Sequence, residues 1–411
     1  MKANNRMKMI ISRLGPFIGL IVIFLMGALL NGTTFLNLYN QINVLGRISI
    51  IALPAVGMTL VILSAGIDLS VGSIVSFSSV ICAMLLMERG WTKASVVALP
   101  IFSVFCLYIG FLIVFRIINK LMDNRKLSRL IASLFGLGLG IIVFLLFKGQ
   151  VKSGFSTVAV LILVPVVGIF LGALNGVIIA KGKIQPFIVT LGMMSIAIGL
   201  AKYIAGKGGQ IHPIYYDAAG YTVDQSVNTA PESFDLLSDK ISVLGVDILP
   251  VAAVFFLLSV LIVHLVLTRL RFGRYVYAIG GNEETARLSG VNVDRIKTLV
   301  YGISGGLSAL AGVLYCAAYT QGKPDAGSTW ELDAIAAVVI GGTSLMGGKG
   351  SVIGTLVGVL ILGYLGNILN LQEVSSEVQN ILKGVIIVGA VLLQEGTLLR
   401  WCKSILRLKS Q

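Results

Sequence analysis

Residues 269–297 read RLRFGRYVYAIGGNEETARLSGVNVDRIK and form a basic, polar island between two long apolar runs. Hydrophobic residues make up 56% of the 411-residue chain, and charged residues only 12%. In a chain of this composition such an island is a loop in water. Its lysines and arginines place it on the cytoplasmic side of a membrane. We therefore expect a cytoplasmic loop over residues 269–297.

The middle of this loop carries the pattern of a short helix. Asn282 is suited to the N-cap, two glutamates fall in the first turn, and Arg287 lies near the last. A capped helix in the cytoplasmic loop of a membrane protein is suited to being gripped by a partner protein. The candidate residues for this contact are Gly280, Gly281, Asn282, Glu283, Glu284, Ala286, Arg287 and Gly290.

The rest of the chain is membrane-like. Its mean hydropathy of +0.94 makes the bilayer the main solvent of the protein. The longest polar stretch, 206–247, has too few apolar residues for a separate core and predicts an extracytoplasmic loop. The net charge of +14 comes from basic residues at the ends of apolar runs. That distribution follows the topology rule and argues against a nucleic-acid partner.

Neither a catalytic set nor a metal-binding pattern stands out. The cysteines and histidines lack ligand spacing; they are Cys82, Cys106, Cys316, Cys402, His212 and His264. The GGKGS stretch at 347–351 lacks the spacing of a phosphate-binding loop. We expect no enzymatic activity, no metal and no cofactor bound by this chain.

Apolar stretches of about 20 residues predict about twelve membrane spans. They cover 14–30, 44–64, 67–87, 95–115, 130–147, 156–180, 186–205, 248–268, 298–319, 331–346, 351–369 and 378–395. Basic residues collect in alternate loops and at both ends, which places both termini in the cytoplasm. The fold class is an all-α polytopic membrane protein, with residues 1–411 as one transmembrane domain.

Two segments differ from ordinary spans. Segment 331–346 is short and opens with two acids, so it is a candidate for a broken or re-entrant helix. The sequence SAGIDLSVG at 64–72 interrupts the second and third segments in a similar way. Small residues dominate both places, and they let the backbone leave the helix around a cavity.

The presence of Asp68 in the interruption at 64–72 requires an explanation, because an ionised carboxylate at membrane depth costs several kcal/mol unless it is paired or hydrated. One interpretation is an N-cap, since Ser70 and Gly72 suit the start of the next helix. The other is a proton or cation site, or an acceptor on a polar path. We favour the cap, because no second acid or base is positioned to complete a relay.

The remaining polar candidates carry the same two interpretations. Glu331 and Asp333 complement the dipole at the head of a helix, or they form a gate or substrate contact. Asn175, Gln185 and Thr190 bond neighbouring helices, or they line a polar path.

Four motifs then occur in a familiar order. They are AVGMTLVILSAGIDLSVGSI at 55–74, LGALNGVIIAKGKIQPFIVTLGMM at 171–194, RFGRYVYAIGGNEETARLSGVNVDRIK at 271–297 and ELDAIAAVVIGGTSLMGGKGSVIGT at 331–355. With these motifs the chain resembles the inner-membrane permease of bacterial binding-protein-dependent ABC importers for monosaccharides, the ribose, galactose and xylose class. The resemblance omits residues 88–153, which read as an insertion of two extra spans on about ten core helices.

The resemblance implies a multi-pass permease in the bacterial cytoplasmic (inner) membrane that translocates a monosaccharide of the galactose/glucose, ribose or xylose type. It implies three partners: a second permease copy or paralogue, an ABC ATPase that holds ATP and Mg, and an extracytoplasmic sugar-binding protein. It also implies that the loop at 269–297 is a coupling loop. Two alternatives stay open: an ion-coupled secondary transporter using Asp68, and an ABC permease for a nucleoside, a branched-chain amino acid or another small polar solute.

Overall fold

The computed structural model describes residues 2–87, 92–121, 125–151, 154–206, 212–213, 231–243 and 245–394. Nearly all of this part of the chain is helical. The helices are α1 (Lys2–Leu36), α2 (Leu38–Leu63), α3 (Val71–Met87), α4 (Lys93–Leu121), α5 (Arg125–Gln150), α6 (Thr157–Gly182), α7 (Pro186–Ala205), α8 (Glu232–Asp235), α9 (Val251–Arg269), α10 (Arg271–Gly281), α11 (Glu283–Leu288), α12 (Val293–Tyr319), α13 (Trp330–Ile340), α14 (Val352–Leu371) and α15 (Ser376–Gln394).

The predicted fold class is confirmed, because long apolar helices account for most of the described residues. A helix occupies each of the twelve predicted segments. Nine helices in the described ranges are long and apolar enough to cross a bilayer, so the exact count of twelve is not confirmed. Helix α13 has 11 residues and a length of about 16 Å, which is too short to cross a hydrocarbon core of about 30 Å.

The centre of the bundle is built on small residues. Helix α6 packs along α12, and a Cβ atom added at Gly172 would overlap the carbonyl oxygen of Tyr301. Gly168 meets the carbonyl oxygen of Gly305 in the same way. Beside this pair, residues 71–86 of α3 are all buried. Glycine at the contact allows the backbones to approach, which is how helices associate closely inside a membrane.

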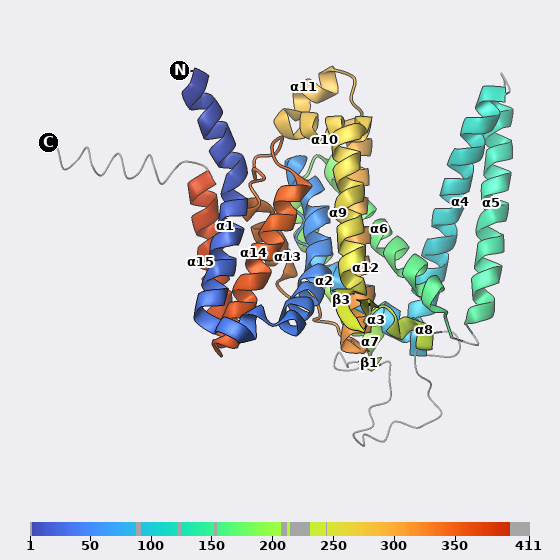
Figure 1. Ribbon diagram of the computed structural model, residues 1–411. Helices are drawn as coiled ribbons and strands as arrows, with labels where there is room; N and C mark the ends of the chain where they lie inside the picture. The colour runs from blue at the N-terminus through green and yellow to red at the C-terminus, as the bar shows by residue number, and fades with distance from the viewer. Residues whose placement is uncertain are drawn as a thin grey trace.

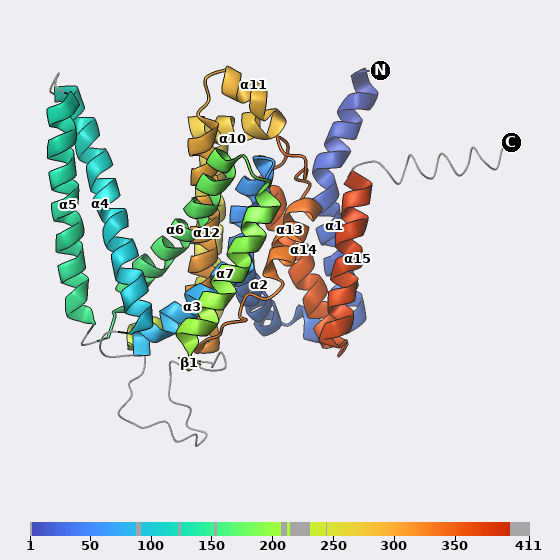
Figure 2. The same cartoon turned by 180° about the vertical axis from the view of Figure 1, so that it is seen from behind.

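Helices α4 and α5 fill the segment expected to be an insertion. They pack on each other, with Gly136 of α5 against the backbone of Leu107 in α4. Figures 1 and 2 show this hairpin standing apart from the main bundle and meeting it at one end. Most of its surface is exposed and apolar, as expected for helices that face lipid.

The two polar ends of the bundle differ. Helices α10 and α11 lie at one end, where α1 also begins (Figure 1). The opposite end carries α8 and two short antiparallel ribbons, which pair β1 (His212–Pro213) with β4 (Gln321–Gly322) and β2 (Lys240–Val243) with β3 (Val246–Pro250). Much of the predicted 206–247 loop, and the C-terminal segment from 395 onward, lie outside the described residues.

Candidate functional site

Helix α11 is the short capped helix that the sequence predicts. The Asn282 side chain accepts a hydrogen bond from the Thr285 backbone N–H at 2.8 Å and so caps the helix. Glu283 and Glu284 lie in its first turn and complement the helix dipole. Gly290 has a φ of +83°, which suits glycine at the turn that leads on to α12.

Ion pairs tie this helix to α12. Glu283 binds Arg287 at 3.5 Å and Lys297 at 2.6 Å, and Arg287 also binds Asp294 at 3.1 Å. The four side chains form one network across α11 and the first turns of α12. Helix α11 is therefore attached to a longer helix that runs through the core of the bundle.

The free surface of α11 is partly apolar. Ala286 is buried against the bundle, whereas Leu288 is 82% exposed and Glu284 is also exposed. Burial of this leucine against another surface would contribute about 1.5–3 kcal/mol.

Helix α10 connects this surface to the two places where the long helices are interrupted. One is the turn at 64–72 after α2, and the other is the glycine loop at 341–351 before α14. A Cβ atom at Gly280 would overlap the carbonyl oxygen of Leu63, the last residue of α2, and would lie 2.5 Å from the Gly348 backbone nitrogen. That nitrogen donates a hydrogen bond to Leu63 O at 3.0 Å. The Tyr277 hydroxyl donates to the Gly350 carbonyl at 2.9 Å. The end of α2, the end of α10 and the glycine loop before α14 therefore meet at one point, which we call the glycine junction (Leu63, Gly280, Gly348).

The first interruption is organised by a buried polar network around Asp68. One carboxylate oxygen of Asp68 accepts bonds from the Ser70 N–H at 3.0 Å and the Ser70 hydroxyl at 2.6 Å. The other oxygen accepts from the Ser304 hydroxyl of α12 at 3.1 Å. Asn175 of α6 donates to the Ser70 hydroxyl at 3.0 Å, and all four side chains are fully buried.

The prediction that Asp68 itself caps α3 needs a correction. Helix α3 begins at Val71, and its first backbone bond runs from the Ile74 N–H to the Ser70 carbonyl. Ser70 therefore occupies the cap position, and Asp68 bonds the cap residue. Asp68 thus fixes the turn before α3 and ties it to α12, because a carboxylate has two oxygens and can serve both contacts.

Two other predicted residues, Gly72 and Thr190, lie beside this turn, and Gln185 lies at the start of α7. Gly72 faces the Gly327 carbonyl and the Glu331 carboxylate so closely that no side chain fits there. Thr190 is buried and its hydroxyl donates to the Pro186 carbonyl at 3.0 Å within α7. Gln185 precedes α7, is exposed, and makes no side-chain cap.

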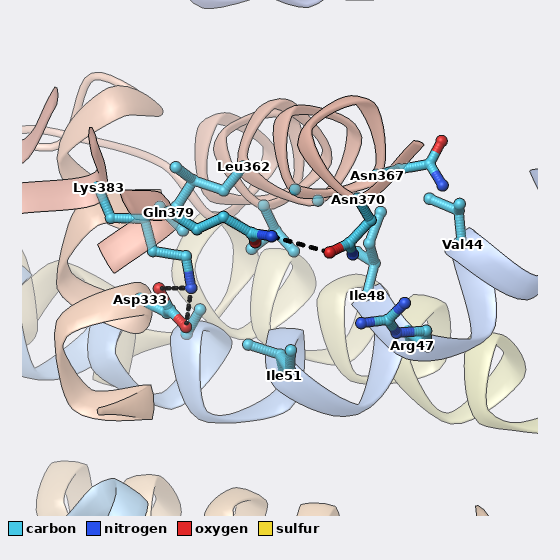
Figure 3. A pocket seen from close by; sticks show the side chains of 15 residues that line it. Val44, Arg47, Ile48, Ile51, Asp333, Leu362, Asn367, Asn370, Gln379 and Lys383 are labelled. Atoms are coloured by element: carbon cyan, nitrogen blue, oxygen red, sulfur yellow. Dashed lines mark hydrogen bonds and ion pairs between the residues drawn. The ribbon is translucent and has the colours of Figure 1, made fainter. Parts of the chain in front are cut away.

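A cavity with a mixed polar and apolar lining lies between α2, α13, α14 and α15, and Figure 3 shows its lining. We call it the α2–α15 cavity; its volume is about 140 Å³. Asp333, in the first turn of α13, forms an ion pair with Lys383 of α15 at 2.9 Å. Nearby, the Gln379 side-chain amide donates to the Asn370 side-chain oxygen at 2.8 Å. The polar lining residues are Arg47, Asp333, Asn367, Asn370, Gln379 and Lys383.

The predicted path residues are thus divided between two places. Asp68, Ser70 and Asn175 form one cluster with Ser304, and Glu331 reaches Gly72 beside it. Asp333 belongs to the α2–α15 cavity. Sequence reasoning missed the rest of that cavity, although Arg47 and Lys383 both stand inside predicted spans, where a charge is a functional signal. In the described part of the chain no group of three or more His, Cys, Asp or Glu side chains could hold a metal ion.

A bundle of apolar helices that is broken by polar turns and holds a partly polar cavity is the architecture of a multi-pass membrane transport protein. Comparison with known proteins defines the class more narrowly. A family model described as the permease component of branched-chain amino acid transport systems matches residues 131–391. The chain belongs to this family of permease components, which confirms the resemblance read from its motifs.

Its relatives in that family include sugar permeases. The chain is 35% identical to a ribose import permease of Haemophilus influenzae, over 92% of this chain and 91% of the relative. It is 36% identical to the ribose import permease of Bacillus subtilis over 93% of each. A xylose transport system permease of Escherichia coli is 32% identical over 88% of this chain and 86% of its own length. No solved structure matches the chain at a significant level.

Proposed function

We propose that this chain is the permease subunit of an ABC importer that moves a monosaccharide into the cell, driven by ATP hydrolysis on a separate ATPase subunit. The single observation that carries the proposal is likeness over almost the full length to ribose import permeases. In this proposal the chain has no catalytic role. ATP and Mg are bound by the partner ATPase, and this chain binds no cofactor.

The coupling step is assigned to α11. Docking of the ATPase on Leu288 and Glu284 would push α11, and the ion pairs to Lys297 and Asp294 would pass the movement to α12. Through Gly280 the same movement reaches the end of α2 and the loop before α14. Both interruptions of the bundle then shift together. This arrangement supports alternating access by rigid helix movement rather than by local unfolding.

The remaining partners follow from the two ends of the bundle. The end that carries α11 is assigned to the cytoplasm, together with both termini. The opposite end, with its short ribbons and the 206–247 loop, is assigned to the extracytoplasmic sugar-binding protein. A second permease copy or a paralogue completes the path.

The main rival is an ion-coupled secondary transporter that uses Asp68. Such a carboxylate must exchange its ion with water during each cycle. Both oxygens of Asp68 are instead bonded to serine donors, and the side chain is fully buried between α3 and α12. This geometry favours a structural role. The second rival is an ABC permease whose cargo is a nucleoside or a branched-chain amino acid. The relatives are named for ribose and xylose, which favours a monosaccharide over either of these cargoes.

Shortening one exposed side chain of α11 tests the proposal that this chain works with an ABC ATPase. Replacing Leu288 with alanine is expected to weaken association with the cognate ATPase by about tenfold or more, because each lost 1.4 kcal/mol of contact is a factor of ten. Import of D-ribose by the assembled complex should fall in parallel. The permease itself should keep its thermal stability, since the Leu288 side chain is 82% exposed. Association is measured by surface plasmon resonance in detergent.

The matched control is Leu299→Ala. Leu299 is an exposed leucine in α12, just beyond the 269–297 loop and outside α11. The Leu299→Ala variant should bind the ATPase and import sugar as the parent protein does. Unchanged association and import in Leu288→Ala would remove α11 from the mechanism.

A further inference from the structure

Six of the fifteen residues that line the α2–α15 cavity are polar or charged, which lipid cannot explain, and the other nine are apolar or glycine. Arg47 stands nine residues into α2, about 13 Å from the start of that helix, and it is exposed. It forms no ion pair with a carboxylate within the described ranges. An exposed guanidinium at this depth carries a large free-energy cost against hydrocarbon. This side of α2 therefore faces water or another polar group rather than lipid chains.

The other polar groups come from different helices and converge on the same space. Asn370 lies in the last turn of α14, and Gln379 and Lys383 lie in the first turns of α15. The turn between these two helices is at the end of the bundle away from α11 (Figure 1). The cavity thus opens in the half of the bundle where a solute delivered from outside would enter.

The chemistry of the lining suits a neutral polyhydroxy ligand. Lys383 is neutralised by Asp333, so the pair offers a donor and an acceptor side by side. The Gln379 amide nitrogen already donates to the Asn370 side-chain oxygen and to the Val374 carbonyl, so Gln379 offers its side-chain oxygen as an acceptor, and the Asn370 amide nitrogen offers a donor. A sugar hydroxyl both donates and accepts, so neighbouring hydroxyls can replace their water contacts with these groups. The small volume of about 140 Å³ also fits a ligand well below drug size.

One glycine of α14 leaves room for such a ligand. Gly363 and Gly366 both line the cavity, but a Cβ atom added at Gly363 would overlap the Ile48 side chain. A Cβ atom added at Gly366 would meet no atom within 4 Å, and its backbone is helical. The absence of a side chain at Gly366 therefore keeps space open without being required for packing.

We propose that the α2–α15 cavity is a binding site for the monosaccharide during its passage, with Asp333, Lys383, Asn370 and Gln379 as its hydrogen-bonding groups. This inference rests on the proposed function, because it takes the cargo to be a neutral sugar. Arg47 adds one unpaired positive charge to the lining, so an anionic sugar acid is the competing cargo to be tested.

A side chain placed at Gly366 tests the proposal. In vesicles that hold the complete importer, Gly366→Leu should lower uptake of D-ribose by tenfold or more, and Gly366→Ala should lower it less. ATPase association and stimulated ATP hydrolysis should persist, since leucine at this helical position fills empty space. The matched control is Gly138→Leu in α5, where an added Cβ also meets nothing within 4 Å. Wild-type uptake in Gly366→Leu would overturn the proposal.

Thiol labelling gives a readout that is independent of transport. Gln379→Cys, inside the cavity, should react with a water-soluble maleimide several-fold more slowly when D-ribose is supplied with the binding protein. Gln372→Cys lies outside the cavity lining and should react at the same rate with and without sugar. Protection by D-ribonate but not by D-ribose would replace the polyol with an anionic cargo and so contradict the proposal. Equal labelling of Gln379→Cys in all conditions, in vesicles that still import D-ribose, would overturn this site and leave the proposed function standing. Failure of the parent protein to import any sugar would instead overturn the proposed function.

Discussion

Replacing Gly280 with alanine is expected to abolish sugar import, whereas the same change at its neighbour Gly281 should leave import close to that of the parent protein. A Cβ atom at Gly280 would overlap Leu63 O and press on the Gly348 nitrogen, which are backbone atoms that cannot swing aside. At Gly281 an added Cβ meets nothing within 4 Å. Both residues close the same helix, α10, so the pair separates the contact from helix propensity.

Overpacking of this kind typically costs about 1–3 kcal/mol, and here it forces α10 away from both interruptions of the bundle. We therefore expect a loss of coupling that exceeds the loss of stability. Import, ATP hydrolysis and thermal stability are measured for both variants in the assembled importer. Normal import by Gly280→Ala would show that the glycine junction does not transmit movement.

The second large effect is expected at Asp68. Asp68→Ala would leave the Ser70 N–H and the Ser70 and Ser304 hydroxyls without their acceptor in a fully buried place. Each buried donor left unsatisfied costs about 1–3 kcal/mol, so a loss of about 3 kcal/mol or more in the free energy of unfolding is expected. The measurement is denaturant unfolding in detergent.

Asp68→Asn is the matched control. Its amide oxygen can keep the bonds from Ser70, and its amide nitrogen can donate to the Ser304 hydroxyl, so the loss of stability should be smaller. Import should persist in Asp68→Asn, because the proposed role of the carboxylate is structural. A stable Asp68→Asn protein that no longer imports sugar would favour the ion-coupled alternative, since asparagine cannot carry the proton.

The helices and the capped loop could be predicted because their signals are local. A run of about twenty apolar residues and the sequence GNEETAR each specify a structure within their own length. Helix α13 shows the same point, because its acids and its short apolar run already suggest a helix that does not cross. The expected acidic first turn, with Glu331 and Asp333, lies where the sequence places it.

The missed features depend on contacts between distant segments. Lys383 contacts Asp333, which lies fifty positions earlier in the chain. Gly280 contacts Leu63, far before it in the sequence, and Gly348, far after it. A single sequence carries no signal for such pairings, because any apolar helix can pack on several others. The sequence pattern predicts the cap of α3 two residues too early, at Asp68 rather than Ser70, for a related reason. The bond from Ser304 that holds Asp68 in its turn comes from α12, more than two hundred positions away.

We infer that the energy for transport enters this chain from a partner ATPase through α11. The most direct test is uptake of radiolabelled D-ribose by vesicles that contain the chain alone, or the chain with its ATPase, supplied with the binding protein. We expect D-ribose to accumulate only when the ATPase, ATP and the binding protein are all present. Accumulation by vesicles that contain this chain alone, driven by a proton or sodium gradient, would contradict this inference.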